Sequence, residues 1–529
     1  MTEKQEKPFC KSVRNYFKEY CRSTSIHGFQ YFGENRSYLE RTWWFIVFAI
    51  ALSSCIYAIL QVYDKWVRSP VIVSFATQET PIYSIPFPAV TICPESKSNQ
   101  EVYSHTDMVK KFANNRSLTT KERNNVKYMS LVCDLVGYIK LPDSDYVDEN
   151  IYSVLSSLNS DYPLFECYYM NKRYNCKDIF VPIYTDEGIC YSFNILDRSE
   201  VFKDIVQHNL DSHQTSQYSD NQWSIEKGYA EDAGLEAYPR RALLSGISNA
   251  LTVRFVTMFN VVDKSGKSGF QGFKVSLHLP SRIPRPSQEY FRIPDNQAVM
   301  AAVSPNMIKT SDSLTNYDVR KRKCHFSYER NLKFFRVYTL LNCKMECLTN
   351  FTLQYCGCVG FYMPRENSTK ICGLAKHACM KKAESILQLL NLRQLRNLDE
   401  AKAKELDQIK MDCNCLPMCS DLSYNTESSQ CEWDWISALF APIENITDLP
   451  LDTSIITSSQ LVVFFKRSDF IFSERNELYG PLDFLANFGG LLGLFTGFSL
   501  LSLMEIVYFL SLRIVFNRRM YGYWAGRDN

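Results

Sequence analysis

The chain has 529 residues, of which 46% are hydrophobic and 22% charged, and its formal net charge is +2. This near-neutral balance lacks the basic excess of a nucleic-acid-binding protein. The length leaves room for about three domains of 150 residues each.

The first apolar segment follows a basic leader. The first 42 residues hold eight Lys and Arg, and Trp43–Val62 then runs without a charged residue. About 20 apolar residues are enough to cross a bilayer. Because this run is longer than the hydrophobic region of a signal peptide, we expect a membrane span that is not cleaved.

The middle of the chain mixes strand-like and helix-like patterns. Runs of β-branched and aromatic residues between turn residues predict strands at Pro88–Cys93, Ile189–Ile195, Leu251–Val262, Phe273–Leu279 and Leu461–Phe465. Helical periodicity predicts helices at Thr106–Asn114, Asn331–Phe351 and Met380–Lys410. The four prolines of Pro280–Asn296 predict a loop over Ser281–Asn296. We therefore expect an α+β domain with its long helices in the second half.

Cysteines concentrate between the two apolar segments. Sixteen of the 19 lie within Cys93–Cys431, and this even number indicates disulfides in an oxidising compartment. Cys343 and Cys347 are four residues apart on a predicted helix, so their thiols lie on one face. We expect this pair to bridge to the cysteine cluster in Cys413–Cys419 like rungs. Zinc is the alternative reading of such a cluster, but no histidine lies nearby at ligand spacing.

Glycosylation sequons and flanking charges indicate which side each part faces. Four N-x-[ST] sequons lie in the cysteine-rich segment, at Asn115, Asn350, Asn367 and Asn445. A fifth sequon, Asn35, falls in the leader, where we expect it to face the cytosol and stay unmodified. Arg513, Arg518 and Arg519 follow the second apolar segment. Both chain ends are therefore expected in the cytoplasm.

No catalytic constellation emerges from the sequence. The seven histidines include no H-E-x-x-H pattern. Ser265–Gly269 reads SGKSG, but a phosphate-binding loop would need a glycine where Val261 stands. His278 lies on a predicted strand, where we expect a structural role. We expect neither enzyme activity nor a bound metal or cofactor.

The second apolar segment, Asn487–Leu512, contains glycines and an acid that a simple membrane anchor does not need. Gly489, Gly493 and Gly497 recur every four residues, so on a helix they lie near one face, where backbones can approach closely. Glu505 falls on nearly the same face. A carboxylate at membrane depth costs about 2.5 kcal/mol or more in lipid, so it normally faces protein or water. This pattern indicates a path for cations.

Five motifs occur in order along nearly the whole chain. They are SIHG at Ser25–Gly28, PFPAVTIC at Pro86–Cys93, GICYSFN at Gly188–Asn194, CNCLPMC at Cys413–Cys419 and GFS at Gly497–Ser499. With these five motifs in this order, the chain resembles the degenerin/epithelial sodium channel/acid-sensing ion channel superfamily. Its further details resemble the insect pickpocket branch of that superfamily.

The resemblance implies an α+β membrane protein. Two transmembrane helices would flank one large, disulfide-rich extracellular domain with a β core and helical finger and thumb regions. Three subunits, identical or sister chains, would surround a central pore in the plasma membrane. The implied boundaries are residues 1–42 for the cytoplasmic N-terminus, 43–63 for the first span, 64–482 for the extracellular domain, 483–512 for the second span and pore, and 513–529 for the cytoplasmic C-terminus.

The resemblance also implies roles for individual residues. The family's selectivity filter maps onto Gly497, Phe498 and Ser499, where a short non-helical break could aim carbonyl oxygens at a cation. The other implied positions are Glu505, Asn487, Gly489 and Gly493 in the pore, and Ala486, His27 and Gly28 in gating.

The family's disulfide pairing carries over to this chain and agrees with the rung arrangement. The implied bridges are Cys93–Cys190, Cys167–Cys176, Cys324–Cys419, Cys343–Cys415, Cys347–Cys413, Cys356–Cys379 and Cys358–Cys372. Cys133 and Cys431 are left over, and we expect them to pair with each other.

Departures from the family pattern limit what can be carried over. Phe498 stands in the filter where acid-sensing members have Ala, so a preference for sodium over potassium is not implied. Asn487 stands where they have an Asp, and Asp64–Val71 lacks their histidines. Proton gating is therefore not supported.

We expect a subunit of a sodium-permeable, amiloride-sensitive cation channel, opened by an extracellular stimulus or open constitutively. One alternative is a two-pass receptor or adhesion protein, which explains the cysteines but not Glu505 or the glycine face. Another is an ATP-gated channel, which the cysteine pattern and the GFS motif disfavour.

Overall fold

The computed structural model describes residues 8–114, 117–133, 144–159, 162–207, 221–263, 270–392, 413–440 and 455–525. It divides into two compact units. Unit 1 comprises Met1–Val73, Asp312–Tyr317 and Asn476–Asn529, and unit 2 comprises Ser74–Ser311 and Asp318–Arg475. Four features predicted above lie outside the described residues: Asn115, Asn445, Ser265–Gly269 and the part of the Met380–Lys410 helix beyond Leu392.

The helices and strands follow in chain order. The helices are α1 (Pro8–Ser23), α2 (Gln30–Gly33), α3 (Tyr38–Arg68), α4 (His105–Ala113), α5 (Thr120–Met129), α6 (Asn150–Leu158), α7 (Cys176–Ile179), α8 (Arg198–Val201), α9 (Val319–Arg322), α10 (Leu340–Cys356), α11 (His377–Leu392), α13 (Trp435–Phe440), α14 (Pro481–Thr496), α15 (Leu500–Leu510) and α16 (Leu512–Tyr521). The strands are β1 (Val71–Phe75), β2 (Thr80–Pro81), β3 (Ala89–Pro94), β4 (Tyr146–Val147), β5 (Leu164–Tyr169), β6 (Lys172–Tyr174), β7 (Phe180–Thr185), β8 (Gly188–Phe193), β9 (Trp223–Ser224), β10 (Gly228–Tyr229), β11 (Leu251–Met258), β12 (Phe273–His278), β13 (Phe291–Ile293), β14 (Gln297–Thr310), β15 (Ile371–Cys372), β16 (Asp421–Glu432), β17 (Ile456–Phe465), β18 (Asp469–Phe470) and β19 (Ser473–Glu477).

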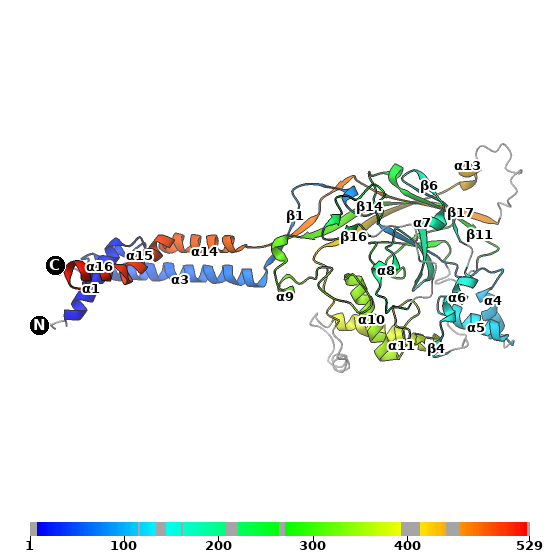
Figure 1. Ribbon diagram of the computed structural model, residues 1–529, viewed down its shortest axis with the longest axis horizontal. Coiled ribbons are helices and arrows are strands. Elements are labelled where there is room, and N and C mark those ends of the chain that lie inside the picture. Colours follow the sequence, from blue (N-terminus) through cyan, green and yellow to red (C-terminus); the bar gives the residue numbers. More distant parts are fainter. Residues whose placement is uncertain are drawn as a thin grey trace. The chain divides into compact units, whose positions relative to one another are not determined.

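Unit 1 is built around two apolar helices that lie side by side, α3 and α14 (Figure 1). Ser37 caps α3 by accepting a hydrogen bond from the Glu40 amide, and the rings of Trp66 and Phe484 pack 5.1 Å apart between the two helices. By length and composition, α3 could cross a membrane. The bent pair α14 and α15 passes the same test if it is counted as one span.

Unit 2 contains two main sheets. In the larger one, the long strand β14 pairs with β16 on one side and with β17 on the other, and β17 is followed by β11, β5 and β6. The smaller sheet has the order β13-β12-β3-β8-β7. Side chains alternate between two faces along β11. Leu251, Val253 and Phe255 are fully buried in the core, whereas Arg254 pairs with Glu166 on β5.

Seven disulfides confirm the pairing that the resemblance implied. They join Cys93–Cys190, Cys167–Cys176, Cys324–Cys419, Cys343–Cys415, Cys347–Cys413, Cys356–Cys379 and Cys358–Cys372. The rungs from α10 to Cys413 and Cys415 are thus disulfides, and these cysteines do not hold zinc. Each such link typically adds about 2–4 kcal/mol of stability by restricting the unfolded chain.

The expected Cys133–Cys431 bridge is wrong. Cys133 is buried in a separate cluster with Tyr103 and Met129, whereas Cys431 lies exposed near the end of β16. Pairing them by elimination ignored this difference in burial.

Several predicted elements have different bounds in the structure; for example, the strand expected at Leu461–Phe465 begins at Ile456. The helix expected from Asn331 begins only at Leu340, because Thr339 caps it and the preceding Phe334, Phe335 and Tyr338 are buried in the core instead. The loop expected over Ser281–Asn296 includes the short strand β13, which pairs with β12. The helix expected from Met380 already begins at His377.

His278 occupies a polar position inside the smaller sheet, in agreement with the structural role expected for it. Its Nε2 lies 2.8 Å from Thr91 Oγ1, and its Nδ1 lies 3.0 Å from the Leu279 carbonyl oxygen. Burial lowers the pKa of His278 from 6.5 to about 4. The ring is therefore neutral in the folded chain over most of the physiological range.

This burial predicts a loss of stability in acid. Between about pH 6.5 and pH 4 the unfolded chain takes up a proton at His278 and the folded chain does not, so the free energy of unfolding falls by up to about 3 kcal/mol. His278→Gln should weaken the pH dependence of the melting temperature of the full chain. The half-exposed His377, changed to Gln, is the control. Equal pH profiles for wild type and His278→Gln would contradict the prediction.

Candidate functional site

The second apolar segment is broken at the GFS motif. Helix α14 ends where Gly497 adopts a φ of +68° and donates its amide to the Gly493 carbonyl. Ser499 is the N-cap of α15: its side chain accepts from the Ser502 amide, while Ser502 Oγ accepts from the Ser499 amide. The two helices meet at an angle of 71°. Glycine suits this break because a positive φ is strained for other residues.

The break changes one expectation from the sequence. We expected Glu505 nearly on the face of Gly489, Gly493 and Gly497, as on a continuous helix. The glycines at 489 and 493 lie on α14 and Glu505 lies on α15, so the 71° bend separates them. The glycines and the acid thus lie on two different helices.

The segment Thr24–Gly28 contacts this break. The His27 amide donates to the Thr496 carbonyl at 3.0 Å, and Ser25 Oγ lies 2.7 Å from Ser502 Oγ. A Cβ atom at position 497 would lie 2.7 Å from the His27 ring. Gly28 has a φ of +84° and turns the chain after this contact. The structure therefore places His27, one of the three expected gating residues, beside the expected filter residue Gly497. Gly28 follows it in the chain, and the third gating residue, Ala486, lies on α14.

Glu505 is held by the same segment. Its Oε2 accepts hydrogen bonds from the Ser25 amide at 3.0 Å and from Thr24 Oγ1 at 3.2 Å. Ser25 Oγ also lies within 3.3 Å of this oxygen. One carboxylate oxygen of Glu505 thus receives three donors from the N-terminal segment.

The other expected pore residues lie along the exposed side of α14. Ala486, Asn487 and Gly489 are exposed within this chain. A Cβ atom added at Gly489 or Gly493 would meet nothing within 4 Å. This side of α14 is therefore open for close contact with another helix.

Three functional candidates were missed in the sequence. Two of them, Thr24 and Ser502, take part in the contacts above. The third, Asp483, is a further acid one helical turn before Asn487, and the side-chain amide of Asn487 donates to the Asp483 carbonyl at 2.8 Å. The Ser499-x-x-Ser502 spacing, typical of a helix start, could have located the break.

Two of the predicted glycosylation sites lie in the described residues. Asn367 is exposed in a turn, while Asn350 is half-buried on α10. Thr352 of the second sequon is fully buried. The surroundings of Asn367 leave more room for a glycan than those of Asn350.

Comparison with known proteins places these features in a family. Residues 20–509 match the family model described as amiloride-sensitive sodium channel. Pickpocket protein 28 of Drosophila melanogaster is 27% identical over 93% of this chain and 78% of its own length. Sodium channel protein Nach of the same species is 20% identical over 95% of this chain and 88% of its own. The bile acid-sensitive ion channel of Mus musculus is 21% identical over 93% of this chain and 87% of its own.

These matches confirm the expected superfamily and its insect pickpocket branch. The family consists of plasma-membrane ion channels rather than enzymes, and it supports a cation channel subunit that assembles with sister subunits. The family model covers most of the chain, from the N-terminal segment at Thr24–Gly28 to Glu505, so the chain belongs to the amiloride-sensitive sodium channel family.

Proposed function

We propose that the chain is one subunit of a trimeric, sodium-permeable and amiloride-sensitive cation channel. In this proposal α3 and the pair α14–α15 are the two spans, residues 64–482 are extracellular and both ends are cytoplasmic. Gly497, Phe498 and Ser499 form the filter. The channel opens on an extracellular stimulus or is open constitutively.

The break at Gly497–Ser499 carries this proposal. Irregular backbone at membrane depth is tolerated only where it is buried in protein or lines water, because lipid offers no hydrogen-bond partners. A receptor or adhesion protein that is merely anchored has no use for such a break. A channel uses it, because carbonyl oxygens released from the helix can replace the water around a cation.

The apolar surface of unit 1 supports the same reading. Trp43 on α3 is 65% exposed in this chain and Leu494 on α14 is 79% exposed. Exposed apolar area costs about 25 cal/mol per Å² in water. Lipid and neighbouring subunits would cover these side chains, and the open side of α14 at Gly489 and Gly493 suits close contact with other copies.

The first prediction tests whether ions pass this segment. Cells expressing the chain, alone or with sister subunits, should carry an inward current that falls when N-methyl-D-glucamine replaces sodium and when amiloride is added. In the variant Ser499→Cys, a charged thiol reagent should block this current. Phe45→Cys on the exposed side of α3 is the control and should be insensitive. If Ser499→Cys is modified without any change in current, the segment is not the conduit.

The second prediction concerns the backbone at Gly497. In Gly497→Ala, the positive φ costs about 1–2 kcal/mol, and the new methyl group meets the His27 ring. We expect the current at equal surface expression to fall by about tenfold or more. Gly490→Ala is the matched control, because a Cβ atom at Gly490 meets nothing within 4 Å. Wild-type current from Gly497→Ala would contradict this role of the break.

The third prediction separates two roles of Glu505. We expect Glu505→Gln to lower single-channel conductance, because the proposed ring of three acids would attract cations. Thr24→Val removes only the hydroxyl that reaches Glu505, so it should leave conductance unchanged and alter open probability.

The double variant completes this test. Because the two residues share a hydrogen bond, the effects of Thr24→Val and Glu505→Gln on the free energy of opening should be non-additive by about 1 kcal/mol. Unchanged conductance in Glu505→Gln would place the acid off the permeation path. Additive effects would show that the contact does not influence opening.

A further inference from the structure

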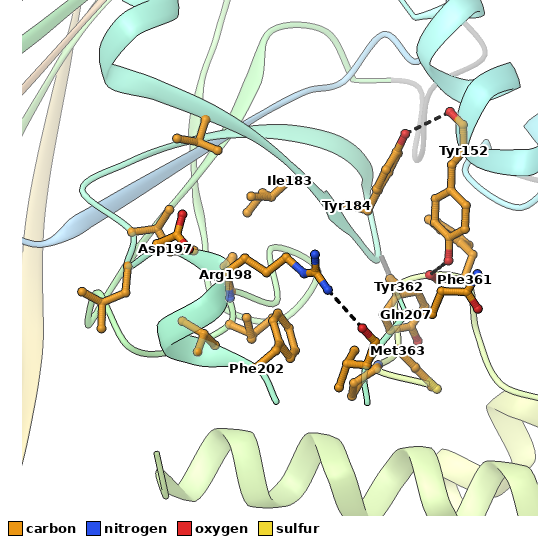
Figure 2. Close-up of a pocket in the computed structure, with 18 residues that line it drawn as sticks. Tyr152, Ile183, Tyr184, Asp197, Arg198, Phe202, Gln207, Phe361, Tyr362 and Met363 are labelled. Carbon is orange, nitrogen blue, oxygen red and sulfur yellow. Dashed lines mark hydrogen bonds between the residues drawn. The ribbon is translucent and has the colours of Figure 1, made fainter. Parts of the chain in front are cut away.

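Unit 2 contains a largely apolar cavity of about 130 Å³ where three elements meet. Strand β7 contributes Val181 and Ile183, helix α8 contributes Arg198 and Val201, and the turn after α10 contributes Phe361–Pro364. Figure 2 shows Arg198 reaching into this cavity between Ile183 and Phe202. One water occupies about 10–15 Å³ of such a volume, so the cavity has room for about 9–13 non-hydrogen atoms.

The tyrosine hydroxyls of the cavity wall are already engaged. Tyr184 donates to the Tyr152 carbonyl at 2.9 Å, and Tyr152 donates to the Phe361 carbonyl at 2.7 Å (Figure 2). The walls therefore present mainly carbon surface. Two charged residues line this space, Asp197 and Arg198.

Arg198 has only partial compensation for its charge. Its guanidinium donates to the Val206 carbonyl at 3.0 Å, whereas its buried Nε has no hydrogen-bond partner among the described residues. Burial lowers the pKa of Arg198 although Asp197 and Asp204 act to raise it. A half-buried cation without a paired carboxylate costs free energy that a ligand's anion could recover.

The two nearby acids have other partners. Asp197 caps α8, where its carboxylate accepts from the Ser199 amide at 2.8 Å. Asp204 lies 2.7 Å from the Arg336 guanidinium at the surface. Within the described part of the chain, neither forms an ion pair with Arg198.

We propose that this cavity binds a small amphipathic monocarboxylic acid. Its carboxylate pairs with Arg198, and its hydrocarbon or aromatic body packs against Ile183, Tyr184 and Phe202. The bound acid bridges the smaller sheet, α8 and the turn after α10. Only its effect on current rests on the proposed channel function, because binding can be measured directly.

The test uses three probes with one body and different head groups. These are 4-phenylbutanoate, 4-phenylbutanol and 4-phenylbutylamine, measured by equilibrium dialysis against the purified full chain in lipid nanodiscs, with empty nanodiscs subtracted. A charge-assisted ion pair in a half-buried site corresponds to about tenfold or more in affinity. We expect the acid to bind more tightly than the alcohol and the amine by this factor.

Variants assign the effect to Arg198. Arg198→Gln should reduce the affinity for the acid to that for the alcohol and leave the alcohol unchanged, and Arg198→Lys should keep part of the preference. Ile183→Trp fills the cavity and should weaken all three probes. The control is Arg173→Gln, because Arg173 pairs with Glu166 on the larger sheet and its side chain is 68% exposed. Melting temperatures confirm that each variant is folded.

Several results would overturn the proposal. These are absence of acid binding, equal affinity for the three head groups, or an acid affinity that Arg198→Gln leaves unchanged. Currents are recorded separately with and without 4-phenylbutanoate. A chain that conducts but binds no acid overturns this inference alone, and a chain that binds the acid but never conducts counts only against the proposed channel.

Discussion

The broken helix depends on hydrogen bonds from outside the helix pair. Ending α14 at Gly497 releases the Thr496 carbonyl, and an unpaired carbonyl in an apolar environment costs several kcal/mol. The His27 amide supplies the partner at 3.0 Å, and Glu505 in turn accepts from Thr24 and Ser25. The N-terminal segment and the break are therefore one interlocked structure, in which moving one part exposes polar groups of the other.

Disulfides give unit 2 a different kind of constraint. Three of the seven bridges begin on α10, at Cys343, Cys347 and Cys356. Three disulfides restrict local unfolding of α10, so we expect the helix to respond to a ligand as a rigid body. The turn that follows α10 lines the cavity around Arg198. A molecule bound in that cavity would therefore contact the segment that directly follows α10.

Much of this arrangement could be predicted where a short motif fixes local geometry. The seven disulfide pairings were implied by the family resemblance, which the motifs support, and β3, β8 and β12 followed from β-branched runs. Strand β14 was missed because Ala301, Ala302 and Pro305 are weak strand formers, and its stability comes from partners on both sides. The contact of Thr24 with Glu505 joins residues 481 positions apart, and no local pattern specifies it.

The buried charges of unit 2 show why the Arg198 cavity differs from the rest of the core. Glu187 is almost fully buried and contacts both Lys97 and Lys274, and Glu95 nearby pairs with Arg292 at 2.8 Å. These opposite charges offset the cost of burial within the fold. Arg198 is instead paired with a neutral carbonyl and borders empty space. In the proposed complex, the carboxylate of the bound acid adds to this compensation, and its apolar body covers the carbon surface around Arg198.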